Sequence, residues 1–187
     1  MTNASYSAAA QAVTSEIASV LKSIDEAQIA DYIAALRQAN KVFFVGVGRV
    51  ALALETTVKR LNHIGITACE VGAINEPPIA PGDVLVVGSG SGESIFPKHI
   101  AQCAKRYGAT VVHLTSSPAS TIARMSDVVV DFHCGSKSGS GTQMSIQPMT
   151  TLFEQSLMIF GDLICLRIMD MQGMTFEQVR LNHANLE

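Results

Sequence analysis

Charged side chains are scarce in this chain. Asp, Glu, Lys and Arg make up only 16% of the 187 residues, and the formal net charge is −3. The 13 Lys and Arg residues are scattered, so no basic stripe indicates nucleic acid or an anionic membrane surface as a partner. No apolar run is long enough to cross a bilayer, and residues 1–5 lack the charged and apolar regions of a signal peptide. We therefore expect neither a nucleic-acid nor a membrane partner.

Cysteine is also sparse, and no two cysteines have C-x-x-C spacing. This argues against a zinc site or a dithiol redox motif. Scattered thiols are typical of a reduced cytoplasmic protein, in which they are buried as small apolar groups. We therefore expect a cytoplasmic location. The four residues are Cys69, Cys103, Cys134 and Cys165.

Hydrophobic residues, in contrast, make up 48% of the chain, which favours a buried sheet and a large subunit interface. The length suits one domain, residues 1–187, that buries roughly 70% of its unfolded surface. Residues 1–40 predict a helical packing arm, in which Ser23 and Glu26 have the spacing of a capping box. Strand-like runs then alternate with helical patterns. The expected strands are 41–47, 66–71, 83–87, 109–114 and 127–132.

This alternation predicts an α/β fold, a doubly wound three-layer sandwich like that of flavodoxin, whose five strands are parallel. We expect the strand order 2-1-3-4-5. Such sheets bind ligands at the carboxyl ends of the strands, at the point where the strand order switches. In this order the first and third strands are neighbours, so the loops that follow them face one crevice.

A run of Gly and Ser follows the third strand and organises the rest of the chain. Val-Val-Gly-Ser-Gly-Ser-Gly-Glu-Ser places Ser89, Ser91 and Ser94 at the start of a helix. Free N–H groups and the helix dipole attract an anion there, and Gly allows close approach of the backbone. The loop is neither a Walker loop nor a dinucleotide fingerprint. We expect a phosphate group here; an ordinary turn with N-caps is the alternative.

A second Gly turn, at Gly48 and Arg49, follows the first strand in the same way. Arg49 could hold the phosphate, or it could serve only a contact between subunits. The polar segment 134–146 predicts a mobile loop near the site.

The last long helix is predicted to start at Pro148 and to run to about residue 171, and it is apolar on nearly every side. An apolar surface all round indicates burial, and we infer a subunit interface. Glu154 is a lone carboxylate early in this helix, so it is either stabilised by the helix dipole or functional. The segment 148–187 is expected to hold the C-terminal helices.

Together these motifs resemble the sugar isomerase (SIS) domain family. The resemblance is carried by Val-Gly-x-Gly-Arg, Gly-Ser-Gly-Ser-Gly-Glu-Ser, Gln147-Pro148-Met149 with Leu-Phe-Glu-Gln, and the terminal His-Ala-Asn-Leu-Glu. The last motif is most similar to the hexulose-phosphate isomerases within that family. The resemblance covers nearly the whole chain from about Lys41.

The resemblance implies a tetrameric enzyme that converts 3-hexulose 6-phosphate to fructose 6-phosphate in the ribulose monophosphate route of formaldehyde assimilation, without a metal or an organic cofactor. By similarity, Ser89, Ser91 and Ser94 hold the phosphate, together with the backbone of Gly90. By the same similarity Glu154 is the base and His183 handles a proton. His63 is a second candidate for proton transfer, because imidazole titrates near neutrality.

Three residues depart from the family pattern: Val50, Glu76 and Thr150 stand where Ser, Thr and Gly are common. They leave two other functions open. One is another aldose–ketose phosphate isomerase, for example of arabinose 5-phosphate. The other is a sugar-phosphate-binding module without catalysis.

Overall fold

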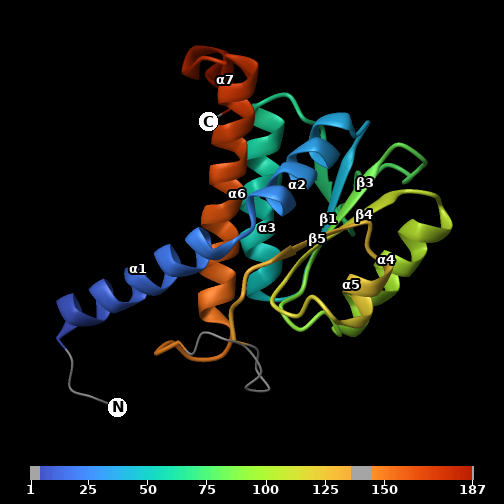
Figure 1. The fold of residues 1–187 in the computed structure, drawn as a ribbon. Coiled ribbons are helices and arrows are strands. Elements are labelled where there is room, and N and C mark those ends of the chain that lie inside the picture. The colour runs from blue at the N-terminus through green and yellow to red at the C-terminus, as the bar shows by residue number, and fades with distance from the viewer. Residues whose placement is uncertain (1–4, 136–144, 187) are drawn as a thin grey trace.

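The computed structural model describes residues 5–135 and 145–186. Two helices, α1 (Tyr6–Ser23) and α2 (Glu26–Gln38), form the N-terminal arm. In Figure 1 the start of α1 projects from the body, whereas α2 lies against the sheet. The remaining elements are β1 (Val42–Val45), α3 (Arg49–His63), β2 (Ala68–Glu70), β3 (Val84–Gly88), α4 (Ile95–Arg106), β4 (Thr110–Thr115), α5 (Thr121–Met125), β5 (Val128–Asp131), α6 (Thr151–Gln172) and α7 (Phe176–Leu181).

The predicted sheet is confirmed. Its five strands are parallel and have the order β2-β1-β3-β4-β5. Val42 of β1 is in register with Val84 of β3, and Val84 with Thr110 of β4. The carboxyl ends of β1 and β3 therefore lie next to each other, which places the two Gly turns side by side.

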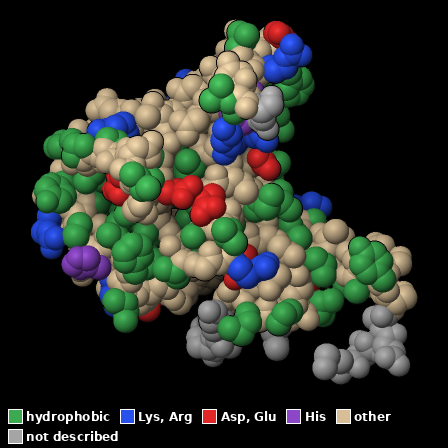
Figure 2. Space-filling view, turned by 180° about the vertical axis from the view of Figure 1, so that it is seen from behind, with side chains coloured by type: hydrophobic (Ala, Val, Ile, Leu, Met, Phe, Trp, Pro, Cys, Tyr) green, Lys and Arg blue, Asp and Glu red, His purple; other side chains and the backbone are tan. Residues whose placement is uncertain are grey.

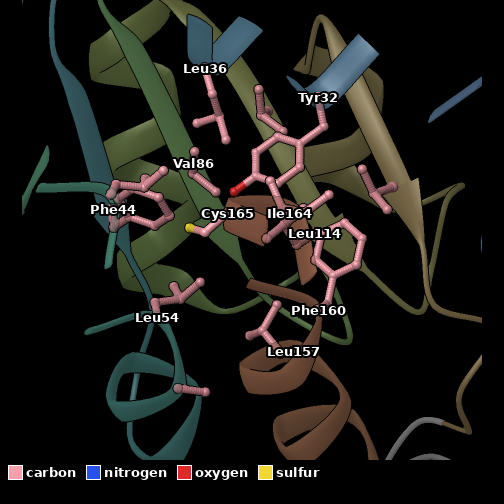
Figure 3. Close-up of a cluster of buried hydrophobic side chains, with 14 of the residues drawn as sticks. Tyr32, Leu36, Phe44, Leu54, Val86, Leu114, Leu157, Phe160, Ile164 and Cys165 are labelled. Carbon is pink, nitrogen blue, oxygen red and sulfur yellow. The ribbon is translucent and has the colours of Figure 1, made fainter. Parts of the chain in front are cut away.

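Helices cover both faces of the sheet, as the alternating pattern predicted. One face packs against α1, α2, α3 and α6 and holds most of the large buried side chains. Figure 3 shows part of this core, a cluster that includes Tyr32 of α2, Phe160 of α6, and Phe44 and Leu114 from the strands. The rings of Tyr32 and Phe160 are stacked, with centroids 5.7 Å apart. The other face packs against α4 and α5. The result is the expected three-layer sandwich.

The predicted capping box in the arm is wrong. Ser23 ends α1, and its hydroxyl donates to the carbonyl of Val20 at 2.8 Å. The N-cap of α2 is Asp25, whose carboxylate accepts from the N–H of Ala27 at 2.6 Å. Ser23 is therefore used by the end of one helix, and a neighbouring Asp caps the next.

The predicted start of the last long helix is also wrong, because α6 begins at Thr151 rather than at Pro148. Met149 has φ of 58°, in the left-handed region, so a right-handed helix cannot pass through it. In the single chain, the outer side of α6 is exposed to the solvent. Its exposed apolar residues include Met158, Ile159, Leu163 and Leu166.

The segment for which we predicted a mobile loop lies largely at positions 136–144, outside the described residues. Within residues 5–135 and 145–186, no helix is long and apolar enough to cross a membrane. On the face seen in Figure 2, Lys and Arg side chains lie in small separate groups among many hydrophobic ones.

Candidate active site

A cavity of about 370 Å³ opens where the two Gly turns meet the start of α6. It collects most of the residues that the sequence singled out, from three separate parts of the chain. They are Gly48, Arg49, Ser89, Gly90, Ser91, Ser94 and Glu154. The predicted crevice at the switch point of the sheet is therefore present.

The Ser-rich loop leaves polar groups available at the start of α4. Ser94 is the N-cap of this helix, but its side chain makes no capping hydrogen bond. The Ser89 hydroxyl accepts from the N–H of Gly92 at 3.1 Å and donates to Ser94 Oγ at 3.3 Å. Ser91 is exposed, and its hydroxyl accepts from the N–H of Glu93 at 3.3 Å. Hydroxyls and unpaired N–H groups at a helix start form an anion site.

Gly92 gives the loop a conformation that other residues would not allow. Its φ is +63°, and a Cβ built there would lie 1.9 Å from Ser120 Oγ and 2.9 Å from Cε1 of His113. Glu93, the next residue of the loop, is fixed to α5, because its carboxylate accepts from the N–H of Thr121 at 2.7 Å. This contact is the main cause of the lowered pKa of Glu93, and nearby Lys98 also lowers it. The loop is thus tied to α5.

Glu154 faces the same cavity from the first turn of α6. One carboxylate oxygen accepts from the Arg49 Nε–H, and the other from the Thr150 hydroxyl at 2.8 Å. The Glu154 side chain is 11% exposed, whereas that of Arg49 is 64% exposed. A nearly buried carboxylate that shares a cavity with the Ser-rich loop is placed to act as a general base toward a ligand in that cavity.

The two histidines predicted for proton transfer lie together but elsewhere. The rings of His63 and His183 have centroids 5.1 Å apart, and Asn182 donates to the His63 carbonyl at 3.0 Å. Burial lowers the pKa of His63, and the positive charges of Lys59 and Arg60 lower it further. His63 ends α3 and Arg49 begins it, so the two ends are roughly 20 Å apart at 1.5 Å per residue. The structure does not bring these histidines to Glu154 of the same chain.

Several contacts near the cavity were not predicted. Thr150, one of the departures from the family pattern, holds the carboxylate of Glu154, and Val50 lines the cavity. Glu76, the third departure, bonds to the N–H of Gly72 at 2.6 Å and is not among the lining residues.

The N-terminal arm also contacts the segment that precedes α6 and leads to the cavity. Glu16 of α1 accepts from the Ser145 hydroxyl at 2.6 Å and from the N–H of Ile146 at 2.9 Å. Gln147 then donates to Gln155 of α6 at 2.9 Å. The arm, expected only to pack, therefore anchors the segment that leads to Thr150 and Glu154.

No group of three or more His, Cys, Asp and Glu side chains that could hold a metal ion occurs among the described residues. That the reaction needs neither a metal nor an organic cofactor stays a prediction.

Comparison with known proteins assigns the class. The SIS domain profile matches residues 35–159, and the chain belongs to this family. The 3-hexulose-6-phosphate isomerase of Bacillus subtilis is 38% identical over 161 residues, 86% of this chain and 85% of that protein. The Mycobacterium gastri protein of the same name is 33% identical over 94% of this chain and 88% of its own length.

A solved structure from Methanococcus jannaschii supports the fold. It matches with a TM-score of 0.83 over 95% of this chain and 98% of its own, at 24% identity. The predicted family and the predicted α/β sandwich are therefore confirmed.

Proposed function

We propose that this protein is a 3-hexulose-6-phosphate isomerase, which interconverts 3-hexulose 6-phosphate and fructose 6-phosphate through an enediol. The observation that carries the proposal is the shared cavity, in which the Glu154 carboxylate faces the Ser-rich loop. Similarity to relatives of that name over most of the chain supports the choice of sugar. The pathway that follows from the name is formaldehyde assimilation by the ribulose monophosphate route.

The phosphate group would bind at the start of α4. Ser89, Ser91 and Ser94 offer hydroxyls there, and the Gly90 backbone lines the same cavity. Gly48 lies across the cavity with φ of 59°, where it is the N-cap of α3 without a side chain. A second helix start therefore faces the ligand, and its dipole favours an anionic oxygen.

Glu154 would act as the general base. Moving the ketone from C3 to C2 requires that a proton leaves C2 and that one is delivered to C3. A single carboxylate on one face of the sugar can do both. Arg49 already donates to this carboxylate, and its guanidinium would stabilise the enediolate oxygen once a sugar is bound.

The histidines would move a proton during ring opening of the cyclic sugar. A 3-ketose phosphorylated at O6 cannot close a five- or six-membered ring, because attack of its free O5 on C3 would give a ring of only four members. The substrate is therefore open-chain. Fructose 6-phosphate forms a furanose, so the reverse reaction needs a group that moves a proton during ring opening. Imidazole titrates in the required range.

We place His63 and His183 in the site of a neighbouring subunit. Their distance from Glu154 in the same chain supports this assignment. A second hollow of about 310 Å³, lined by Leu52 and Met158, also contains Arg49 and Glu154. A subunit seated there would lie directly beside the carboxylate. The exposed apolar side of α6 would form part of a homotetramer, the assembly that we propose.

A cytoplasmic location belongs to the same proposal, and the free state of Cys69, Cys103, Cys134 and Cys165 supports it. Burial raises the pKa of Cys134 to about 11 and that of Cys165 to about 12, which keeps both thiols protonated near neutral pH.

The test is a coupled assay with 3-hexulose 6-phosphate, run beside arabinose 5-phosphate. We expect turnover of the hexulose to exceed that of the pentose by a large factor. Preference for arabinose 5-phosphate would assign the second type of isomerase. Binding of both sugars without turnover would assign a sensing module.

A further inference from the structure

The Ser-rich loop binds an anion only if its carbonyl oxygens point away from the cavity, because their lone pairs would repel a phosphate oxygen. The loop follows β3, and β4 is the next strand of the sheet (Figure 1). Two side chains of β4 contact these carbonyls. Nε2 of His113 lies 3.2 Å from the Ser89 carbonyl oxygen, and the Thr115 hydroxyl donates to the Gly90 carbonyl at 3.2 Å.

Each of these carbonyls has a second donor. The Ser89 oxygen also accepts from the N–H of Gly92 at 3.1 Å, which is shared with the Ser89 hydroxyl, and the Gly90 oxygen accepts from the N–H of Ser116 at 3.1 Å. A carbonyl oxygen has two lone pairs. Two donors therefore occupy the acceptor capacity of each oxygen.

His113 is suited to a fixed role as donor. Its side chain is fully buried, and its hydrogen-bond partner is a carbonyl, so Nε2 carries the proton. Burial lowers its pKa to about 4, which keeps the ring neutral near pH 7. Nδ1 has no hydrogen-bond partner among the described residues, so the bond to the loop is the one polar contact that fixes the ring there.

We propose that His113 and Thr115 are positioning residues for the anion site. They hold the carbonyls of Ser89 and Gly90 pointing away from the cavity, so that the loop presents N–H and hydroxyl groups to a phosphate. This inference rests on the proposed function only in taking the ligand to be a phosphate monoester. Neither residue is among those that line the cavity.

The first test is a matched pair at His113, with inorganic phosphate as the probe in titration calorimetry. His113→Leu removes the donor and keeps a similar volume, whereas His113→Gln keeps a donor near Nε2. One lost hydrogen bond of this kind should weaken phosphate binding about 3- to 10-fold in the Leu variant. The Gln variant should bind within about 2-fold of wild type.

The second pair is Thr115→Val and Thr115→Ser, which differ in the hydroxyl. The Val variant should weaken phosphate binding and the Ser variant should restore it. The Thr115 hydroxyl also accepts from the N–H of Ser117 at 3.0 Å, so Val affects both contacts. Val111→Ala is the control. It shortens another buried side chain of β4 but leaves the loop carbonyls untouched, and phosphate affinity should not change.

The separate effects of the substitution on KM and on kcat distinguish a loss of positioning from a general loss of structure. In His113→Leu the KM for the sugar phosphate should rise with the phosphate Kd, while kcat stays within about 2-fold. Wild-type phosphate affinity in both His113→Leu and Thr115→Val would overturn this inference alone. If the wild-type protein binds no phosphate, the proposed function fails instead. An equal loss of affinity in Val111→Ala would show that the effect is one of packing and would also overturn the inference.

Discussion

Arg49 and Glu154 are paired across the cavity although 105 positions of the chain separate them. Arg49 begins α3 and Glu154 lies in the first turn of α6, so the pair joins the starts of the two helices that cover one end of the site. The carboxylate is nearly buried, while the guanidinium remains largely open to the solvent. Three predictions concern this cavity directly.

The first is that Arg49→Gln lowers kcat/KM for 3-hexulose 6-phosphate about 10- to 100-fold, because a hydrogen bond to a charged oxygen is lost in the transition state. The free energy of unfolding should change by less than about 1 kcal/mol, since the Arg49 side chain is mostly exposed. Arg49→Lys should recover only part of the activity, because Lys cannot reproduce the planar donor geometry. Steady-state kinetics and urea unfolding measure both effects.

The second prediction concerns Glu154→Gln, which preserves size but cannot accept a proton. We expect kcat to fall by about 10²- to 10⁴-fold, with phosphate affinity retained. Exchange of the C2 proton with deuterated solvent, followed by NMR, reports on the base directly. Glu76→Gln is the control, because Glu76 bonds to the N–H of Gly72 outside the cavity. Exchange at the wild-type rate in Glu154→Gln would place the base elsewhere, and Glu93 would be tested next.

The third prediction is that Ser91→Ala raises KM for the phosphorylated sugar more than it lowers kcat, provided that the phosphate contact is equally strong in the ground and transition states. Ser126→Ala is a suitable comparison, because the Ser126 hydroxyl donates to the Ile122 carbonyl at the end of α5. An unchanged KM in Ser91→Ala would remove this hydroxyl from the anion site.

Acid stability gives a fourth prediction. The pKa of His113 falls from its ordinary value near 6.5 to about 4 in the folded chain because the ring is buried, and the hydrogen bond to the Ser89 carbonyl and nearby Glu93 offset this only in part. The unfolded chain therefore binds the proton first as the pH drops. Stability from this group is complete above pH 6.5 and is lost progressively toward pH 4, by roughly 3 kcal/mol in total. Urea unfolding at pH 7.5, 5.5 and 4.5 should show a flatter acid limb for His113→Gln than for wild type. Parallel curves would contradict the assignment.

The fifth prediction concerns assembly. Leu166 lies on the exposed side of α6 with 54% of its surface accessible, so Leu166→Glu places a charge in the proposed interface and should shift the tetramer toward smaller species. Tyr107→Glu changes an exposed apolar residue at the end of α4, on the other face of the sheet, and should leave the mass unchanged. Light scattering at micromolar concentration decides this. A wild-type monomer would refute the tetramer.

The sequence was sufficient for the parallel sheet and for its two Gly turns, because both follow from local patterns; the strand order was assumed by analogy with flavodoxin-like folds and is confirmed. Buried strand runs alternate with helices, and each Gly turn lies directly after its strand. The position of Glu154 in the cavity followed from the family resemblance rather than from spacing, which favoured an ordinary residue at a helix start.

Features set by tertiary packing could not be predicted. The left-handed backbone of Met149, which delays the start of α6, is unusual for that residue type and leaves no signal in the sequence. The contact from His113 to Ser89 spans 24 positions and depends on the register of β3 with β4. The distance between His63 and Glu154 likewise follows from the length and direction of α3.

Gly92 limits the order in which this loop can change in evolution. Any single replacement adds a Cβ to a left-handed backbone and places it 1.9 Å from the Ser120 hydroxyl oxygen. Because even the Ser120 Cβ would lie only 2.4 Å away, Ser120 would have to lose its whole side chain first, yet that side chain caps α5 through the N–H of Ala123. The change at Ser120 therefore lowers stability before the change at Gly92 can bring any benefit. Exposed Ser91 has no such steric constraint, so this position of the loop can change without a preceding mutation elsewhere.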